Sequence, residues 1–286
     1  MKKLSIVLLS VLLLIVFVGC DLSVETMGKM GKNLAGTDKN YVASIIKQTE
    51  PEAAKKKDED GKITITGSNF SISASEGKGS ISIGGKDVKV PSELQTAINK
   101  VLTDSEFSSI ILPTDISDIV LGVKSGSNSE IIKEELKKTA KDDSLKAAQG
   151  TVTLVNAMLD EVQKAVKDDD PEGGFDEVIK DIKGFLPDKG SITNGDVVVL
   201  TALTNIVFNE NVLSNVGSIM EKPESPSDKD AQDKYDSAMK EVTGEMMNQF
   251  SSLLDVVTNV PSGMSNKIND FINDLMDSSN NKEKAE

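Results

Sequence analysis

Residues 62–90 read KITITGSNFSISASEGKGSISIGGKDVKV, and apolar and polar side chains alternate through most of this stretch. Because successive side chains of a β-strand point to opposite faces of its sheet, this period of two predicts short strands with one apolar face. The apolar pairs that define four strands are Ile63 and Ile65, Phe70 and Ile72, Ile81 and Ile83, and Val88 and Val90. Glycine-containing segments between these pairs supply the turns. We expect a small antiparallel meander whose apolar face lies on helices, since an isolated sheet of this size is only marginally stable.

The pattern becomes helical after Pro91, where apolar residues recur three or four positions apart. Ser92 and Gln95 form a capping-box pattern at the start of the first helix, which is predicted to reach residue 102. Residues 110–121 are expected to form two short turns around Pro113. Further helices are predicted at residues 130–140, 145–167, 175–186, 196–208, 227–257 and 264–276. The fold class is therefore α+β: a predominantly helical bundle with a small antiparallel β-meander near the N-terminus.

Three predicted helices carry patterns that indicate how they pack. Residues 145–167 have a heptad seam made of Leu145, Ala148, Val152, Val155, Leu159, Val162 and Val166. A seam of barely three heptads in a varied chain favours packing in an intramolecular bundle over a dimeric coiled coil. Residues 196–208 are apolar on every side, which predicts a central, buried helix. The charged helix at residues 130–140 is expected on the surface, held by Ile131, Ile132 and Leu136.

The first twenty residues, MKKLSIVLLSVLLLIVFVGC, carry targeting information. Two lysines precede an almost wholly apolar run, residues 4–18, and the segment ends in Gly19 and Cys20. This order is typical of a secretion signal, and the run is shorter than the roughly 20 residues that span a bilayer.

This segment resembles a bacterial lipoprotein signal peptide with its lipobox. Phe17 stands where Leu, Val or Ile is usual, which resembles the looser lipoboxes of spirochaetes. The resemblance implies removal of residues 1–19, attachment of two or three acyl chains (palmitate) at Cys20, and export from the cytoplasm to the cell envelope. Asp21 resembles an enterobacterial signal for the inner membrane, a rule that other lineages do not share, so the inner and the outer membrane both stay open. A plain secretion signal cut elsewhere and an uncleaved anchor are the alternatives.

The composition excludes several classes of function. Removal of Lys2 and Lys3 leaves 30 lysines against 46 acidic residues, so the formal charge changes from −14 to −16. Such a chain is a poor nucleic-acid partner, because that binding needs clustered positive charge. The sequence contains no histidine, which is the commonest general base near neutral pH and a common zinc ligand. The lipid would consume the single cysteine, Cys20, and no cofactor is expected.

The chain divides into four parts. We expect a signal peptide at residues 1–19 and a lipidated, flexible tether at residues 20–36. One α+β domain is expected at residues 37–277, with the meander at about 62–90 and the bundle at about 92–277. Residues 278–286 are polar and are expected to form a disordered tail.

One acidic segment has the order of residues found in calcium loops. Asp168, Asp170 and Glu172 precede a glycine at the sixth position, Gly173, which resembles the front of a helix-loop-helix calcium site. The twelfth position is Ile179 in place of the bidentate glutamate, so any calcium would bind weakly. The alternative is an ordinary acidic loop between two helices.

No catalytic residue is predicted. Ser44 with Lys47, and Ser237 with Lys240, have the S-x-x-K spacing of penicillin-binding enzymes, but the other motifs of that family are absent from the sequence. We therefore expect a non-enzymatic structural or interaction role at the cell envelope, with membrane attachment through Cys20 and an unidentified protein partner. The alternative is a weak ligand-binding lipoprotein, for calcium or for an apolar small molecule held between helices.

Overall fold

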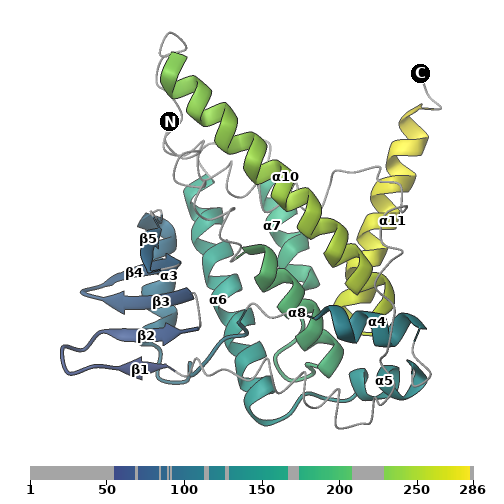
Figure 1. The fold of residues 1–286 in the computed structure, drawn as a ribbon, viewed down its shortest axis with the longest axis horizontal. Helices are drawn as coiled ribbons and strands as arrows, with labels where there is room; N and C mark the ends of the chain where they lie inside the picture. The colour runs from purple at the N-terminus through teal and green to yellow at the C-terminus, as the bar shows by residue number, and fades with distance from the viewer. Residues whose placement is uncertain are drawn as a thin grey trace.

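The computed structural model describes residues 55–67, 70–83, 85–88, 90, 92–112, 116–125, 129–166, 174–207 and 229–283. These residues form a mixed α+β structure, which confirms the predicted fold class at this level. Figure 1 shows the sheet and α3 on one side of α6, and the other helices on the opposite side.

The sheet is a five-stranded antiparallel meander in which each strand pairs with its neighbour in sequence. Its strands are β1 (Lys56–Lys57), β2 (Ile63–Thr66), β3 (Phe70–Ser75), β4 (Lys78–Ile83) and β5 (Lys86–Val88). Ile65, Ile72, Ile81 and Val88 stand opposite one another and form an apolar row across four strands. The structure thus confirms the four predicted strands, although the last one ends at Val88 and does not include Val90, and it adds β1, which the sequence analysis did not predict.

The turn between β3 and β4 consists of Glu76 and Gly77. Both residues have positive φ angles, 51° and 79°, which is the backbone of a type I′ hairpin turn. This turn twists in the same sense as the strands that it joins and places Ser75 opposite Lys78. Glycine adopts this conformation without strain, but glutamate rarely does.

The helices follow the sheet along the chain. They are α3 (Ser92–Thr103), α4 (Ser117–Ser125), α5 (Ser129–Leu136), α6 (Asp142–Val166), α7 (Gly174–Phe185), α8 (Asn194–Val207), α10 (Lys229–Asn259) and α11 (Gly263–Glu283). Most of the predicted helices are confirmed, with small shifts of their ends. The helix α11 continues to Glu283, past residue 278, where a disordered tail was expected.

Three local predictions need correction. Residues 117–125 form the helix α4, where the sequence analysis expected a short turn after Pro113. Ile131 was expected to help hold α5 on the core, but it is 44% exposed. Only Ile132 and Leu136 are buried there. The capping box at α3 does not form, because the side chain of Gln95 donates to the carbonyl oxygen of Val90 at 2.7 Å. That carbonyl lies in the segment that leads into α3, so Gln95 ties this segment to the first turn of the helix.

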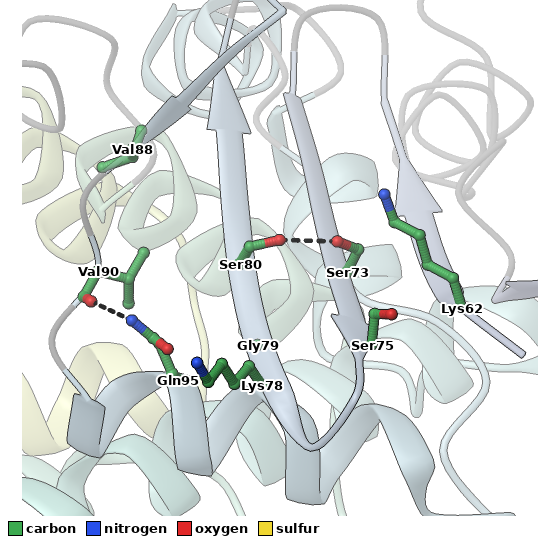
Figure 2. Close-up of a pocket in the computed structure, with 9 residues that line it drawn as sticks. All are labelled: Lys62, Ser73, Ser75, Lys78, Gly79, Ser80, Val88, Val90 and Gln95. Atoms are coloured by element: carbon green, nitrogen blue, oxygen red, sulfur yellow. Dashed lines mark hydrogen bonds between the residues drawn. The ribbon is translucent and has the colours of Figure 1, made fainter.

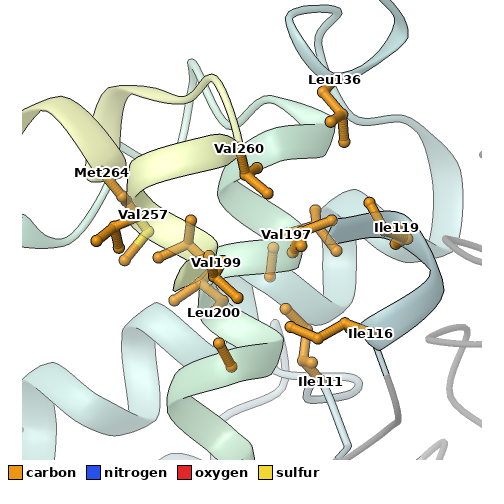
Figure 3. Packing of buried hydrophobic residues seen from close by; sticks show 14 of the residues in the cluster. Ile111, Ile116, Ile119, Leu136, Val197, Val199, Leu200, Val257, Val260 and Met264 are labelled. Carbon is orange, nitrogen blue, oxygen red and sulfur yellow. The ribbon is translucent and has the colours of Figure 1, made fainter. Parts of the chain in front are cut away.

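The core consists of two clusters of buried apolar side chains. The sheet cluster joins the apolar face of the meander to α3 and includes Ile65, Ile72, Ile98 and Leu102. The helical cluster surrounds α8, whose residues Val197, Val198, Val199 and Leu200 are each at most 1% exposed. Figure 3 shows α8 residues gathered with Val257, Val260 and Met264. The prediction that this helix is buried is confirmed.

The helix α6 contributes side chains to both clusters. Ala148 and Val152 of the predicted seam belong to the helical cluster, and Leu159 belongs to the sheet cluster. Val155 packs against both. The described part of the seam therefore packs against both clusters of the core.

Candidate functional site

The residues predicted to carry lipid or calcium lie outside the described part of the chain, whereas Ser237 and Lys240 are exposed on α10. Cys20 precedes the described part, and Asp168, Asp170 and Glu172 fall in the connection between α6 and α7. Lipidation and calcium binding therefore stay predictions. Among the residues that the structure does describe, no three acidic, histidine or cysteine side chains come together in a way that could hold a metal ion.

A pocket of about 250 Å³ opens instead at the edge of β4. β5 pairs with β4 through Ile81, Ser82 and Ile83. β5 ends at Val88, so the first residues of β4, Lys78 to Ser80, have no pairing with β5. The pocket lies beside these three residues (Figure 2). The described residues that line it are Lys62, Ser73, Ser75, Lys78, Gly79, Ser80, Val88, Val90 and Gln95.

The register of the sheet brings the polar lining together. Ser73 stands opposite Ser80, and Ser75 stands opposite Lys78. Since side chains two positions apart share a face, these four residues lie on the face opposite the apolar row. Lys62 lies two positions before Thr64, which is itself opposite Ser73. Three strands thus place three serines and two lysines along this face. In Figure 2 the ammonium group of Lys78 lies beside Gln95, and that of Lys62 lies on the far side of Ser73, so the two charges flank the hydroxyl pair.

Two hydrogen bonds hold the walls of the pocket. The hydroxyls of Ser73 and Ser80 are 2.8 Å apart, and Ser73 is 7% exposed. The amide of Gln95 holds the carbonyl of Val90 on the opposite wall (Figure 2). These bonds fix the positions of the hydroxyl pair and of the segment leading to α3.

Gly79 sets the distance between the sheet and α3 at this point. A Cβ atom added to Gly79 would lie 2.4 Å from the Cβ of Ile98 and 2.7 Å from the carbonyl oxygen of Gln95. Contacts this short are far inside van der Waals distance, so any side chain here would push α3 away. The small residue therefore keeps Gln95 close enough to line the pocket.

The charge of the pocket differs from that of the whole chain. None of the nine described lining residues is acidic, and two are lysines. Within the described residues, no carboxylate forms an ion pair with Lys62 or Lys78. Residues 55–100 contain eight lysines and six acidic residues, so this segment is slightly basic in a chain of net charge −14.

This geometry is suited to binding a polar ligand. A serine nucleophile needs a base in hydrogen-bond contact, and the hydroxyl of Ser73 pairs with another hydroxyl. The sequence analysis missed this pocket because Ser73, Ser80 and Lys78 come together through the register of β3 and β4. The alternation of serine with isoleucine in residues 71–82 was the signal that could have indicated a hydroxyl-lined face.

Comparisons with protein-family models, with curated proteins and with solved structures gave no match to this chain. Within the part of the chain that the structure describes, no helix combines the length and the apolar character needed to cross a membrane.

Proposed function

We propose that this protein is a lipid-anchored component of the bacterial cell envelope with a non-enzymatic structural or interaction role. The observation that carries the proposal is the segment of residues 1–20, with its two lysines, its apolar run and its terminal Gly19-Cys20. Removal of residues 1–19 would leave Cys20 as the lipidated N-terminus. The protein would be exported from the cytoplasm and held at the inner or outer membrane.

The energetics of acyl chains support a stable anchor. Each buried methylene contributes about 0.8 kcal/mol, so one chain binds a membrane reversibly and two or three bind it firmly. The predicted tether at residues 20–36 would have an end-to-end distance of roughly 20–25 Å as a flexible coil. That distance exceeds the Debye length of about 8–10 Å at physiological salt, so the acidic domain would lie beyond most of the repulsion from anionic lipids.

A non-enzymatic role agrees with the chemistry of the described residues. Their buried interior is mostly apolar, and their pocket has no histidine, carboxylate or thiol among its lining residues. The helices after the sheet, which the sequence predicts to form a bundle within one domain at residues 37–277, would then act as a rigid scaffold. The pocket adds ligand binding as a second candidate function, for a polar ligand at the sheet.

Mass spectrometry of the protein purified from bacterial membranes tests the proposal. We expect the mature chain to begin at Cys20 and to carry the mass of two or three acyl chains. The Cys20→Ser variant should keep its signal peptide and lose the acyl mass. An unmodified thiol at Cys20 in a protein found in the cytosol would contradict the proposal. Protease treatment of intact cells would then show whether the anchored domain faces outward.

A further inference from the structure

We propose that the pocket beside β4 binds a phosphate monoester, with Lys62 and Lys78 contacting the phosphate and the pocket serines donating hydrogen bonds to it. The inference does not depend on the lipid anchor, because it rests on residues of the sheet and α3. Its failure would leave the proposed envelope location untouched.

The two lysines provide the charge. Both line one pocket, and among the described residues neither ammonium group forms an ion pair, although the carboxylate of Asp58 accepts a hydrogen bond from the backbone N–H of Lys62 at 2.8 Å. A phosphate monoester carries a charge of about −1.5 to −2 at neutral pH, which two ammonium groups match. A carboxylate carries one charge and would leave one lysine unbalanced. The charge of the pocket therefore favours phosphate over carboxylate.

The serines provide directional donors. In the pair of Ser73 and Ser80, one hydroxyl donates to the other, so one proton remains to be donated outward. Ser75 adds a third hydroxyl beside Lys78. Phosphate oxygens accept several hydrogen bonds, and those from charged donors are the strongest. The lining thus combines two charged donors with neutral donors on a rigid sheet.

The size and the apolar walls limit the ligand further. The volume of about 250 Å³ equals that of roughly eight water molecules in the liquid and is below the range of about 300–1,000 Å³ typical of drug-sized ligands. The described lining has no aromatic ring on which a sugar or a base could stack. Recognition would therefore centre on the phosphate, with the organic part of the ester resting on Val88 and Val90.

The distribution of charge over the chain favours this site for an anion. Residues 55–100 carry a small positive net charge, whereas the chain as a whole carries −14. An anion is repelled by most of such a surface and less strongly by the segment that forms the sheet and α3. The lysines next to the pocket are thus the favourable place for a small anion to bind.

NMR titration of the full-length mature protein, in detergent micelles at fixed ionic strength, tests the inference. The probes are inorganic phosphate and glycerol phosphate. We expect saturable shifts of the amide signals of Ser73, Gly79 and Ser80, with a Kd on the order of 1 mM. The double variant Lys62→Met and Lys78→Met should weaken binding by about 10-fold or more, because it removes both charged hydrogen-bond donors of the pocket.

A matched control separates the pocket from general electrostatics. Lys100 is exposed on α3 and does not line the pocket, so Lys100→Met should leave the Kd unchanged. Equal weakening by Lys100→Met, or the absence of saturable shifts in the native protein, would overturn the inference. Binding of glucuronate as tightly as glycerol phosphate would overturn the choice of phosphate.

The source of the phosphate group is distinguished by competition. Glycerol phosphate presents the monoester in solution, and phosphatidic acid in phosphatidylcholine vesicles presents it on a membrane. Displacement of inorganic phosphate by either one supports the inference and identifies the source. Displacement by neither would overturn it. The two lysines are exposed, so the double variant should keep the fold, which an unchanged melting temperature checks.

Discussion

The carboxylate of Asp196 accepts a hydrogen bond at 3.0 Å from the backbone N–H of Met264, a residue 68 positions further along the chain. Its other oxygen accepts from the backbone N–H and the hydroxyl of Thr193, at 2.9 and 2.8 Å. Thr193 returns a bond from its hydroxyl oxygen to the N–H of Asp196 at 3.1 Å, which completes a capping box at the start of α8. One carboxylate therefore caps two helices, α8 and α11, while it is 2% exposed.

We expect Asp196→Ala to lower the free energy of unfolding by roughly 2–4 kcal/mol, because it leaves buried N–H groups at two helix starts without acceptors. Urea denaturation followed by circular dichroism measures the effect. Asp188→Ala removes an exposed carboxylate from the preceding loop and should change stability by less than about 0.5 kcal/mol. A loss below about 1 kcal/mol in Asp196→Ala would contradict the double-cap assignment.

Gly150→Ala should destabilise the protein by about 1–3 kcal/mol or more. A Cβ atom at Gly150 in α6 would lie 1.9 Å from the carbonyl oxygen of Ser109, and a backbone atom cannot move aside as a flexible side chain does. Gly184→Ala in α7 is the matched control, since its added Cβ would meet nothing within 4 Å. That change should stabilise the protein by roughly 0.4–1 kcal/mol, because alanine favours the helix. Thermal denaturation of both variants distinguishes these opposite signs.

Glu76→Asn should stabilise the protein by about 0.5–1 kcal/mol. Glu76 has a φ of 51° in the turn between β3 and β4, and asparagine adopts positive φ more readily than glutamate does. A rise in melting temperature of a few degrees is the expected measurement. Glu76→Gln removes the same charge without this backbone preference and should leave the melting temperature unchanged. An equal rise in both variants would show that charge, not backbone strain, is responsible.

Glu130 should titrate below the usual range of a glutamate. Its hydrogen bond with the Lys133 ammonium at 2.9 Å, together with the charge of that group, lowers the pKa of Glu130. Because the pKa of Glu130 is lower in the folded state, the pair stabilises the fold at any pH above the pKa of the unfolded state. This stabilisation is lost as the pH falls through the folded-state pKa. Carbon NMR of the carboxyl group measures the pKa directly, and Lys133→Met should raise it. Because the pair lies on the surface, added salt should weaken the shift.

The sequence predicted those elements that have a strong local period. The alternation of residues 63–83 identified β2, β3 and β4, because one face of each strand must be apolar to lie on α3. The uniformly apolar residues 197–200 identified the buried helix α8. In each of these segments the local pattern and the tertiary environment agree.

Features that depend on residues far apart could not be predicted. The two lysines of β1 carry no strand pattern, and their strand forms because they pair with β2 and because the N–H of Lys55 donates to the carbonyl of Ser108 at 2.9 Å. The bond between Asp196 and Met264 requires the loop before α11 to meet the start of α8. The pocket likewise requires the register of three strands and the close contact of α3 at Gly79.

The order of the strands bears on how the protein would reach its place in the envelope. Every strand hydrogen-bonds to the strand next to it in the chain, and α3 follows at once. Pairings between residues close in sequence cost little loop-closure entropy and form quickly. In a chain that is exported as proposed, the N-terminal part leaves the translocation channel first. The meander can then assemble while α8, α10 and α11 are still in transit, so its serine face would be the earliest folded surface of the nascent protein outside the cytoplasm.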